Sequence, residues 1–311
     1  LGGRKLGPIV TAMSTEASDM SAYLLMGVPG LAMFCGLAEA SWTAIGLAAG
    51  TYLNWLIVAK RLHRYSVKLN AITVPDYLAL RFRDNTRLIE TLGALTIIIF
   101  FVPYTASGFS ACGKLFNSLF GFDYMTSMLI SAAVIVIYCA TGGFMAASVT
   151  SLIQGIVMTI ALIIILFFGI NTAGGWDVVV ANAKEIPGYL SFTASTNIFA
   201  DQAGSYTPLM IVSTLAWGLG YFGMPHIIIR FMSLRSDKDL KKSAKIGITW
   251  TLLILTFSVA SGIIGHLLLG EIDDSSVVFI TMVRKIFPAL ISGLLLSAIL
   301  AAAMSTADSQ L

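Results

Sequence analysis

The chain has 311 residues, of which 57% are hydrophobic and only 11% are charged. Soluble domains carry about one quarter charged residues, and a single soluble core cannot enclose so much apolar surface. The net charge of +3 is small and does not indicate a nucleic-acid partner. Apolar runs long enough to cross about 30 Å of hydrocarbon recur along the chain. The composition therefore predicts an all-α polytopic membrane protein that has the lipid bilayer as its solvent.

Eight apolar segments are long enough to span a membrane, and we expect residues 1–311 to form a single transmembrane domain. We also expect the chain to be part of a longer protein, truncated at both ends. Residue 1 is Leu without a signal-peptide pattern, and the last apolar run stops inside a predicted helix. The predicted spans are 11–30, 42–59, 92–111, 124–146, 152–170, 207–229, 246–269 and 287–310.

Lys and Arg residues are distributed unequally between the two sides that these spans define. One side, which holds the N-terminal end and segments 60–91 and 230–245, has 15 of them, and the other side has 4. Cytoplasmic loops carry the excess of Lys and Arg. The pattern predicts that the N-terminal end faces the cytoplasm. Within 60–91 we expect a short interfacial helix at 77–82, or a basic loop that faces anionic lipid. Segment 171–206 is predicted to be an external loop with a short helix.

The first span contains two carboxylates, Glu16 and Asp19, among hydroxyl side chains. An ionisable group inside a membrane is costly unless it is paired or hydrated, so such groups are functional candidates. The alternative is that both carboxylates lie at the cytoplasmic mouth and are solvated.

The sixth span has three glycines between residues 218 and 223, followed by Pro225. Such a sequence is unfavourable for a continuous helix, and broken backbone in a membrane lines a cavity or is buried in protein. Trp217 and Tyr221 are four residues apart and are predicted to share a helix face. The alternative is that the glycines serve close helix packing and the aromatic residues form an interfacial belt.

The last span contains small residues followed by the adjacent hydroxyls of Ser305 and Thr306. Hydroxyl groups of this kind commonly bond to the carbonyls of their own helix, so the pattern alone is weak. Beside it, an unwound segment 17–21 in the first span presents free carbonyl oxygens. Together the two segments predict an all-oxygen shell that suits a hard cation.

Five runs of residues resemble the sodium/solute symporter family, and they occur in order over the whole chain. Within that family they are most similar to the proline-transporting branch. The resemblance implies the inverted-repeat transporter fold first seen in LeuT, with one helix before this chain and several after it. The first and sixth spans are then the discontinuous pair. The runs are Leu1-Gly-Gly-Arg, Ala17-Ser-Asp-Met-Ser, Val74-Pro-Asp-Tyr, Trp217-Gly-Leu-Gly-Tyr-Phe-Gly and Leu295-Leu-Ser-Ala-Ile-Leu-Ala-Ala.

The resemblance also implies two sets of site residues. Sodium is expected at the backbone carbonyls of Ala17, Met20 and Ala302 and the hydroxyls of Ser305 and Thr306. Asp19 matches the carboxylate that the family links to sodium dependence, and it acts indirectly. Positions around the substrate are matched by Ser21, Tyr138, Trp217, Tyr221 and Pro225. Aromatic walls suit a pyrrolidine ring, and a half-helix N-terminus favours the substrate carboxylate.

This chain departs from the family pattern at four positions. Ala22 and Tyr23 stand where Gly and Trp are expected, and Glu16 stands where a small residue is usual. The added methyl group of Ala22 leaves the identity of the substrate open. Ser151 replaces an aspartate that some relatives use for a second cation site, which favours one sodium per cycle.

We therefore predict sodium-coupled symport of L-proline into the cell across the inner (plasma) membrane, with Na⁺ as the bound ion and no nucleic-acid partner. Alternatives are another substrate, such as a different amino acid, pantothenate or an inorganic anion, and the membrane domain of a sensor kinase. A membrane-embedded enzyme is disfavoured, because the histidines have no obvious nucleophile or metal partner. The cysteines likewise show no disulfide or metal spacing. These residues are His63, His226, His266, Cys35, Cys112 and Cys139.

Overall fold

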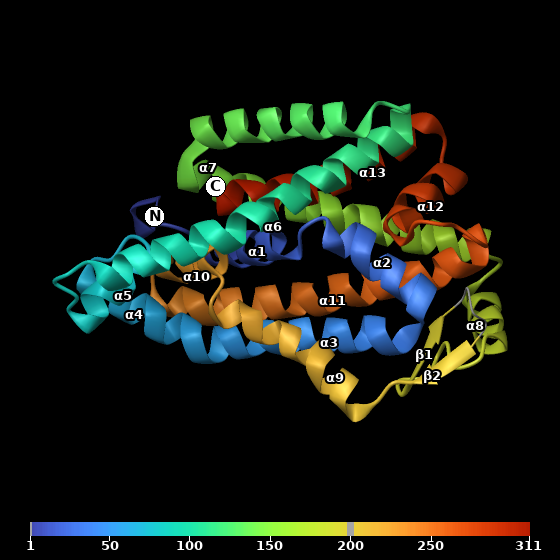
Figure 1. The fold of residues 1–311 in the computed structure, drawn as a ribbon, viewed down its shortest axis with the longest axis horizontal. Helices are drawn as coiled ribbons and strands as arrows, with labels where there is room; N and C mark the ends of the chain where they lie inside the picture. The colour runs from blue at the N-terminus through green and yellow to red at the C-terminus, as the bar shows by residue number, and fades with distance from the viewer. Residues whose placement is uncertain (1, 198–201) are drawn as a thin grey trace.

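The computed structural model describes residues 2–197 and 202–311. Leu1 of the first family run and residues 198–201 of the expected external loop lie outside the described residues. Long helices lie side by side along the longest axis of the molecule (Figure 1). The α-helices are α1 (Pro8–Met20), α2 (Tyr23–Cys35), α3 (Leu37–Leu53), α4 (Lys60–Leu69), α5 (Val74–Phe82), α6 (Leu88–Phe120), α7 (Tyr124–Thr172), α8 (Trp176–Glu185), α9 (Pro208–Leu215), α10 (Pro225–Met232), α11 (Asp237–Leu269), α12 (Val278–Ile286) and α13 (Ala289–Gln310). Shorter elements are the 3₁₀ helices η1 (Gly2–Arg4), η3 (Ala216–Phe222) and η4 (Ser275–Val277), the π-helical turn η2 (Asn54–Ala59), and the strands β1 (Ala194–Asn197) and β2 (Gln202–Ser205).

The predicted spans agree with the helices in number only roughly. Among the described residues, five helices are long and apolar enough to cross a membrane, and the bent pair Pro208–Phe222 and Pro225–Met232 makes six. The fourth and fifth predicted spans lie within α7, which folds back on itself at Gly143 (φ 64°, ψ 175°) and forms two antiparallel arms (Figure 1). The first predicted span is divided between α1 and α2, and each half is too short to span alone.

Several helices extend beyond the predicted spans into the basic segments. The second span continues without interruption from Leu37 to Leu69, and α11 begins at Asp237 rather than near residue 246. The predicted interfacial helix is present as α5, and it starts earlier, at Val74, because the Thr73 hydroxyl caps it by accepting from the Asp76 N–H (3.1 Å). Much of each basic segment is therefore helical and extends a span, and only the remainder forms loops.

The expected external loop contains the predicted short helix, α8, and also an antiparallel hairpin that the sequence did not predict. Strands β1 and β2 pair Ala194 with Ser205. Trp42 of α3 donates from its indole N–H to the Phe192 carbonyl (2.8 Å), which fixes the hairpin against the bundle.

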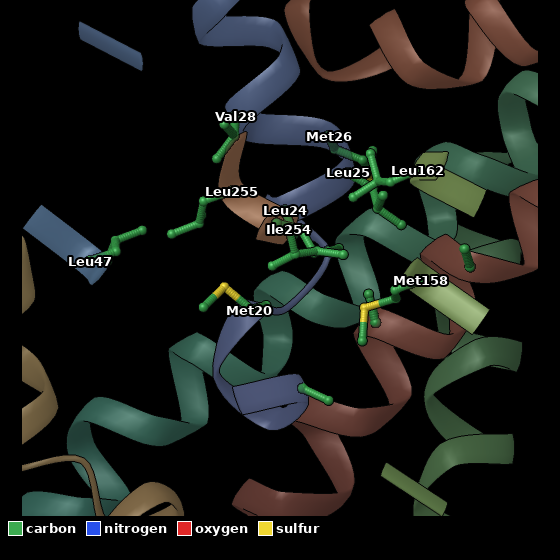
Figure 2. Close-up of a cluster of buried hydrophobic side chains, with 14 of the residues drawn as sticks. Met20, Leu24, Leu25, Met26, Val28, Leu47, Met158, Leu162, Ile254 and Leu255 are labelled. Atoms are coloured by element: carbon green, nitrogen blue, oxygen red, sulfur yellow. The ribbon is translucent and has the colours of Figure 1, made fainter. Parts of the chain in front are cut away.

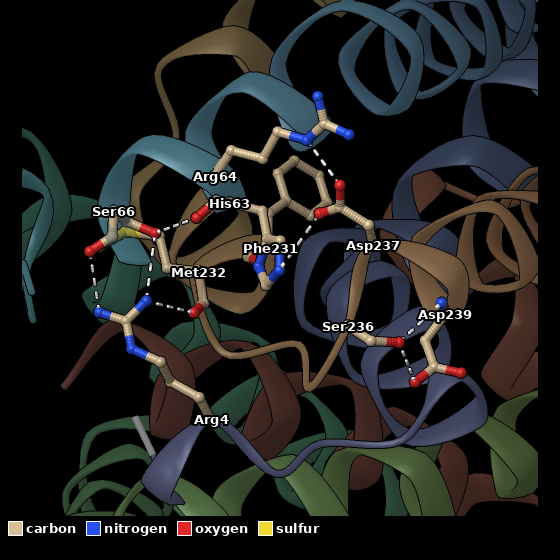
Figure 3. A network of polar contacts seen from close by, with 9 residues as sticks. All are labelled: Arg4, His63, Arg64, Ser66, Phe231, Met232, Ser236, Asp237 and Asp239. Atoms are coloured by element: carbon tan, nitrogen blue, oxygen red, sulfur yellow. Dashed lines mark hydrogen bonds and ion pairs between the residues drawn. The ribbon is translucent and has the colours of Figure 1, made fainter. Parts of the chain in front are cut away.

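The basic segments meet at one end of the bundle (Figure 3). The Arg4 guanidinium donates to the carbonyls of Ser66 (3.0 Å), Ala71 (2.8 Å) and Met232 (3.3 Å), so η1, α4 and α10 are joined there. Arg64 of α4 pairs with Asp237 at the start of α11 (2.6 Å). The structure thus brings together the N-terminal end and the two basic segments 60–91 and 230–245.

The apolar core surrounds the junction of α1 and α2 (Figure 2). Met20 and Leu25 lie at the junction, among side chains of α3, α7 and α11 that are also buried. These neighbours are Leu47, Met158, Leu162, Ile254 and Leu255. All three cysteines are free thiols, as expected for small packing residues. Packing from three other spans therefore holds the broken first span in place.

Candidate functional site

The first span is broken at Ser21, whose backbone has φ 46° and ψ −174°. This conformation is close to a region that glycine occupies readily and other residues avoid. The prediction that residues 17–21 are unwound is wrong for most of the segment, because α1 remains helical to Met20. The last four carbonyls of any helix lack an intrahelical partner. The carbonyls of Ala17 and Met20 thus belong to a helix end and not to an unwound segment. In both cases they are backbone carbonyl oxygens without an intrahelical partner.

The sixth span is broken where the glycines predicted it. The segment 216–222 is a 3₁₀ helix, and α10 starts at Pro225 after a bend of 45°. A Cβ atom on Gly218 would lie 2.0 Å from the Gly46 carbonyl oxygen, and one on Gly50 would lie 2.3 Å from the Gly218 oxygen. The backbones of η3 and α3 are therefore in direct contact. The glycines serve close helix packing, which was the alternative, in addition to breaking the helix.

The predicted shared face of Trp217 and Tyr221 is wrong, because the segment has three residues per turn and not 3.6. Tyr221 is 3% exposed, while Trp217 is 46% exposed. Both side chains nevertheless line one cavity of about 500 Å³. Trp217 lies against Tyr23 at the start of α2, with ring centroids 5.0 Å apart. The two breaks therefore face each other across this cavity, which has a volume typical of ligand sites.

The predicted substrate residues are divided between two cavities. Ser21, Trp217 and Tyr221 line the first cavity together with Asp19. Tyr138 and Pro225 line a second cavity of about 610 Å³, next to α5 and the fold in α7. Pro225 is separated from Tyr221 because the bend directs α10 away from η3. Gln310 borders both cavities. The five residues therefore do not form one pocket in this structure.

The predicted sodium residues come from two helices that pack against each other, α1 and α13. All five are buried: Ala17, Met20, Ala302, Ser305 and Thr306. Ser305 donates to the Ser151 hydroxyl of α7 (3.1 Å), the position where an aspartate was expected. The Thr306 hydroxyl has no hydrogen-bond partner, and Thr306 and Met20 line the first cavity. A buried hydroxyl without a partner, next to a helix C-terminus, is consistent with an absent oxygen-binding ion.

Glu16 and Asp19 are both buried, at 2% and 7% exposure, so the alternative of a solvated pair at the cytoplasmic mouth is wrong. Glu16 accepts hydrogen bonds from the Trp55 indole (2.8 Å) and from the Thr251 hydroxyl (2.9 Å). Asp19 borders the first cavity and interacts with Tyr221. The backbone carbonyl of Asp19 accepts from the Tyr104 hydroxyl (3.4 Å).

Arg230 is a site residue that the sequence analysis missed, since it was assigned to a basic loop. Its side chain is 2% exposed and donates to Ser14 of α1 (3.1 Å), Ser309 of α13 (2.6 Å) and the His226 carbonyl. Arg230 directly follows the apolar run 227–229, where a Lys or Arg at the end of a span is ordinary, so no sequence signal distinguished it from a loop charge. Arg230 joins α10 to α1 and α13.

The three histidines lie on three different helices, α4, α10 and α11. His63 Nδ1 lies 3.0 Å from the Phe231 carbonyl, and His266 contacts the Tyr189 ring (5.1 Å between centroids). His226 is buried between Phe101 and Tyr104, at centroid distances of 5.4 and 6.3 Å. Within residues 2–197 and 202–311, no group of three His, Cys, Asp or Glu side chains could hold a metal ion.

Comparison with known proteins agrees with this arrangement. The profile of the sodium:solute symporter family matches residues 1–311. The chain belongs to this family. Its relatives are transporters, and the apolar helices make it a multi-pass membrane protein.

Curated relatives align with the complete chain. They include the osmoregulated proline transporter OpuE (42% identical, 62% of its length) and the high-affinity proline transporter PutP (43%, 65%), both of Bacillus subtilis. Sodium/proline symporter 2 of Staphylococcus saprophyticus is 41% identical over 60% of its length. The chain thus spans about three fifths of the length of these relatives.

Two solved structures share the fold. A Na⁺-coupled sialic acid symporter in a substrate-bound outward-open state has a TM-score of 0.81 at 19% identity, covering 99% of this chain and 65% of the other. A transporter of the nucleobase-cation-symport-1 family has a TM-score of 0.60 at 13% identity, covering 99% of this chain and 64% of the other. These similarities confirm the expected LeuT-type transporter fold.

Proposed function

We propose that the full-length protein is a sodium-driven symporter that carries L-proline into the cell. The observation that carries this proposal is the first cavity, which lies between two broken helices. It is lined by a carboxylate, a hydroxyl and two aromatic side chains: Asp19, Ser21, Trp217 and Tyr221. Relatives that are 40–43% identical over the whole chain are named as proline transporters, and this supports proline as the substrate.

The break in the first span presents two opposite helix ends to the cavity. The C-terminus of α1 at Met20 carries partial negative charge, and the N-terminus of α2 at Tyr23 carries partial positive charge. A cation is favoured at the first end and a carboxylate at the second. Trp217 and Tyr23 offer apolar surface to a pyrrolidine ring. A zwitterionic imino acid and one small cation match these groups.

We assign the sodium ion to the contact between α1 and α13. Sodium leaving water must exchange its hydration shell for several oxygens at close range. The carbonyls of Ala17, Met20 and Ala302 and the hydroxyls of Ser305 and Thr306 are the oxygens proposed for this shell. Asp19 contributes long-range negative charge from the adjacent turn of α1. The free hydroxyl of Thr306 supports the assignment.

Uptake of labelled proline tests the proposed function. Full-length protein in proteoliposomes should accumulate proline with an inward sodium gradient and should not do so with an equal potassium gradient. Asp19→Asn should abolish accumulation, because the carboxylate charge beside the α1 terminus is lost. Proline uptake that ignores sodium, or sodium-driven uptake of another solute with proline excluded, would reject the proposal.

We also propose that the end of the bundle with Arg4, α4 and α5 faces the cytoplasm, because cytoplasmic loops carry most Lys and Arg. In a variant without the native cysteines, Lys68→Cys should resist an impermeant thiol reagent added to intact cells. Glu271→Cys, in the loop after α11, should react and serves as the matched control. Reaction of Lys68→Cys with protection of Glu271→Cys means that the orientation is reversed.

A further inference from the structure

Glu16 lies in a pocket of neutral hydrogen-bond donors on the side of α1 that faces α3, η2 and α11. Trp55 donates to one carboxylate oxygen and Thr251 to the other, at 2.8 and 2.9 Å. Thr51 also bonds the carboxyl group. A Cβ atom on Gly247 would lie 3.0 Å from Glu16 Oε1, so the glycine provides the room for this side chain. Donors directed at both oxygens favour the ionised form of the group, in which both oxygens only accept hydrogen bonds.

Two more buried oxygens close to Glu16 have no partner. Asp19, one turn further along α1, leaves Oδ2 without a hydrogen bond. Asn54 of η2 is 2% exposed and uses its amide N–H to bond the Tyr221 carbonyl (3.0 Å), so its Oδ1 is left unpaired. Buried oxygens without a donor are rare, and they commonly mark an unobserved water or ion.

Glu16, Asp19, Thr51 and Asn54 all line one small cavity. The volume that the centre of a water-sized sphere can occupy in this cavity is about 10 Å³. This space holds a single water or an ion of similar size. The polar side-chain atoms around this cavity that receive no hydrogen bond are all oxygen atoms. Oxygen is the ligand atom that hard cations such as sodium prefer.

The charge of the two carboxylates also calls for a cation. Within residues 2–197 and 202–311, no ion pair joins Glu16 or Asp19 to a Lys, Arg or His. The buried Arg230 is directed elsewhere, since it bonds Ser14 and Ser309 and interacts with Asp308. A buried carboxylate without a counter-charge is strongly unfavourable, and a neutral water does not supply that charge.

We propose that Glu16, Asp19 and Asn54 form a second sodium site, separate from the site between α1 and α13. This proposal replaces the expectation of one sodium per cycle, which concerned only the position of Ser151. The two sites lie on different sides of α1, because α13 contributes no residue to the small cavity. The inference rests on the proposed function for its role in transport. A second ion bound beside α1 raises the sodium-to-proline ratio and makes sodium activation of uptake cooperative.

Equilibrium binding of radioactive sodium to the purified full-length protein tests the site without proline or transport. The wild type should bind one more sodium ion per protein than Glu16→Gln, which keeps the shape of the side chain and removes its charge. Glu271→Gln removes a charge from an exposed loop and should bind as the wild type does. Equal sodium binding by Glu16→Gln and wild type overturns the proposal.

Fluorescence of Trp55 gives a second measurement that does not require the variant at Glu16 to fold. Because its indole bonds Glu16, sodium should change the wild-type emission, and this change should be lost in Trp55→Phe. Potassium is the larger alkali cation and keeps its oxygen ligands at longer distances, so it serves as the control and should change the emission less than sodium does. A Trp55 signal that follows pH and not sodium means that a proton occupies the site, which overturns the sodium assignment. Sodium binding that survives when proline uptake fails separates this site from the proposed function.

Discussion

The two broken spans reach similar geometry by different routes. The sixth span carries its break in its own sequence, with Gly218, Gly220 and Gly223 before Pro225. The first span has neither glycine nor proline at its break, and Ser21 takes a backbone conformation that glycine would adopt more easily. Packing of α3, α7 and α11 around the junction holds that residue in place (Figure 2). One break is local in origin, and the other is imposed by tertiary contacts.

The largest expected effect is at the glycine contact that seats the sixth break. Gly218→Ala puts a methyl group 2.0 Å from the Gly46 carbonyl, where backbone cannot give way. We expect a loss of about 3 kcal/mol of stability or more, measured as thermal unfolding in detergent. Gly220→Ala is the matched control, because its Cβ would meet only the flexible end of Met224 at 3.8 Å. Equal melting of the two variants contradicts the backbone contact.

The next effect concerns the ion expected at the first break. Thr306→Ala removes a buried hydroxyl that has no protein partner. The sodium concentration for half-maximal uptake should rise about tenfold, which corresponds to about 1.4 kcal/mol, while that for proline changes much less. Thr306→Ser keeps the oxygen and should restore the wild-type value. Unchanged sodium dependence in Thr306→Ala removes α13 from the site.

A smaller effect is expected at the aromatic wall of the sixth break. Trp217→Ala removes the ring that lies against Tyr23, and such ring pairs contribute about 0.5–1.5 kcal/mol. The KM for proline should rise by up to about tenfold at similar membrane expression. Trp176→Ala, at a comparably exposed position in α8, should leave KM unchanged. If uptake falls only in proportion to expression, Trp217 serves packing alone.

The smallest effect tests the first break itself. In an ordinary helix, Ala is more stable than Gly by about 1 kcal/mol. At Ser21 this order should reverse, since its strained conformation costs about 1–3 kcal/mol for a residue with a Cβ atom. Melting temperatures of Ser21→Gly and Ser21→Ala measure the order. At Ser18, inside α1, the same pair of substitutions should show the ordinary order.

The difference between the breaks also explains what the sequence could predict. Hydropathy located the spans, and the glycines and Pro225 located the sixth break, because these signals act through the local backbone. The position of the first break was misplaced toward residue 17, because nothing near Ser21 favours an interruption. The fold within α7 is local in origin, since it lies at Gly143, whose φ of 64° glycine adopts readily.

The residues of the candidate site could be named from the sequence, but their arrangement in space could not be predicted. Resemblance named Ser305, Thr306 and Tyr221, which the structure buries next to α1 or the first cavity. It did not foresee that Tyr138 lines a different cavity, next to the fold in α7 at Gly143. The partners of Glu16 come from α3, η2 and α11, so no short stretch of sequence brings them together.

The glycine contact has a consequence for motion as well as for stability. Atoms of two backbones in contact have no flexible side chain between them, so η3 and α3 cannot slide or tilt independently. Trp217 of η3 meets Tyr23 of α2 through its partly exposed ring. Side-chain contacts of this kind can slip and re-form. A change of access to the cavity therefore carries η3 and α3 together as one rigid body, with the joint at the boundary between Trp217 and Tyr23.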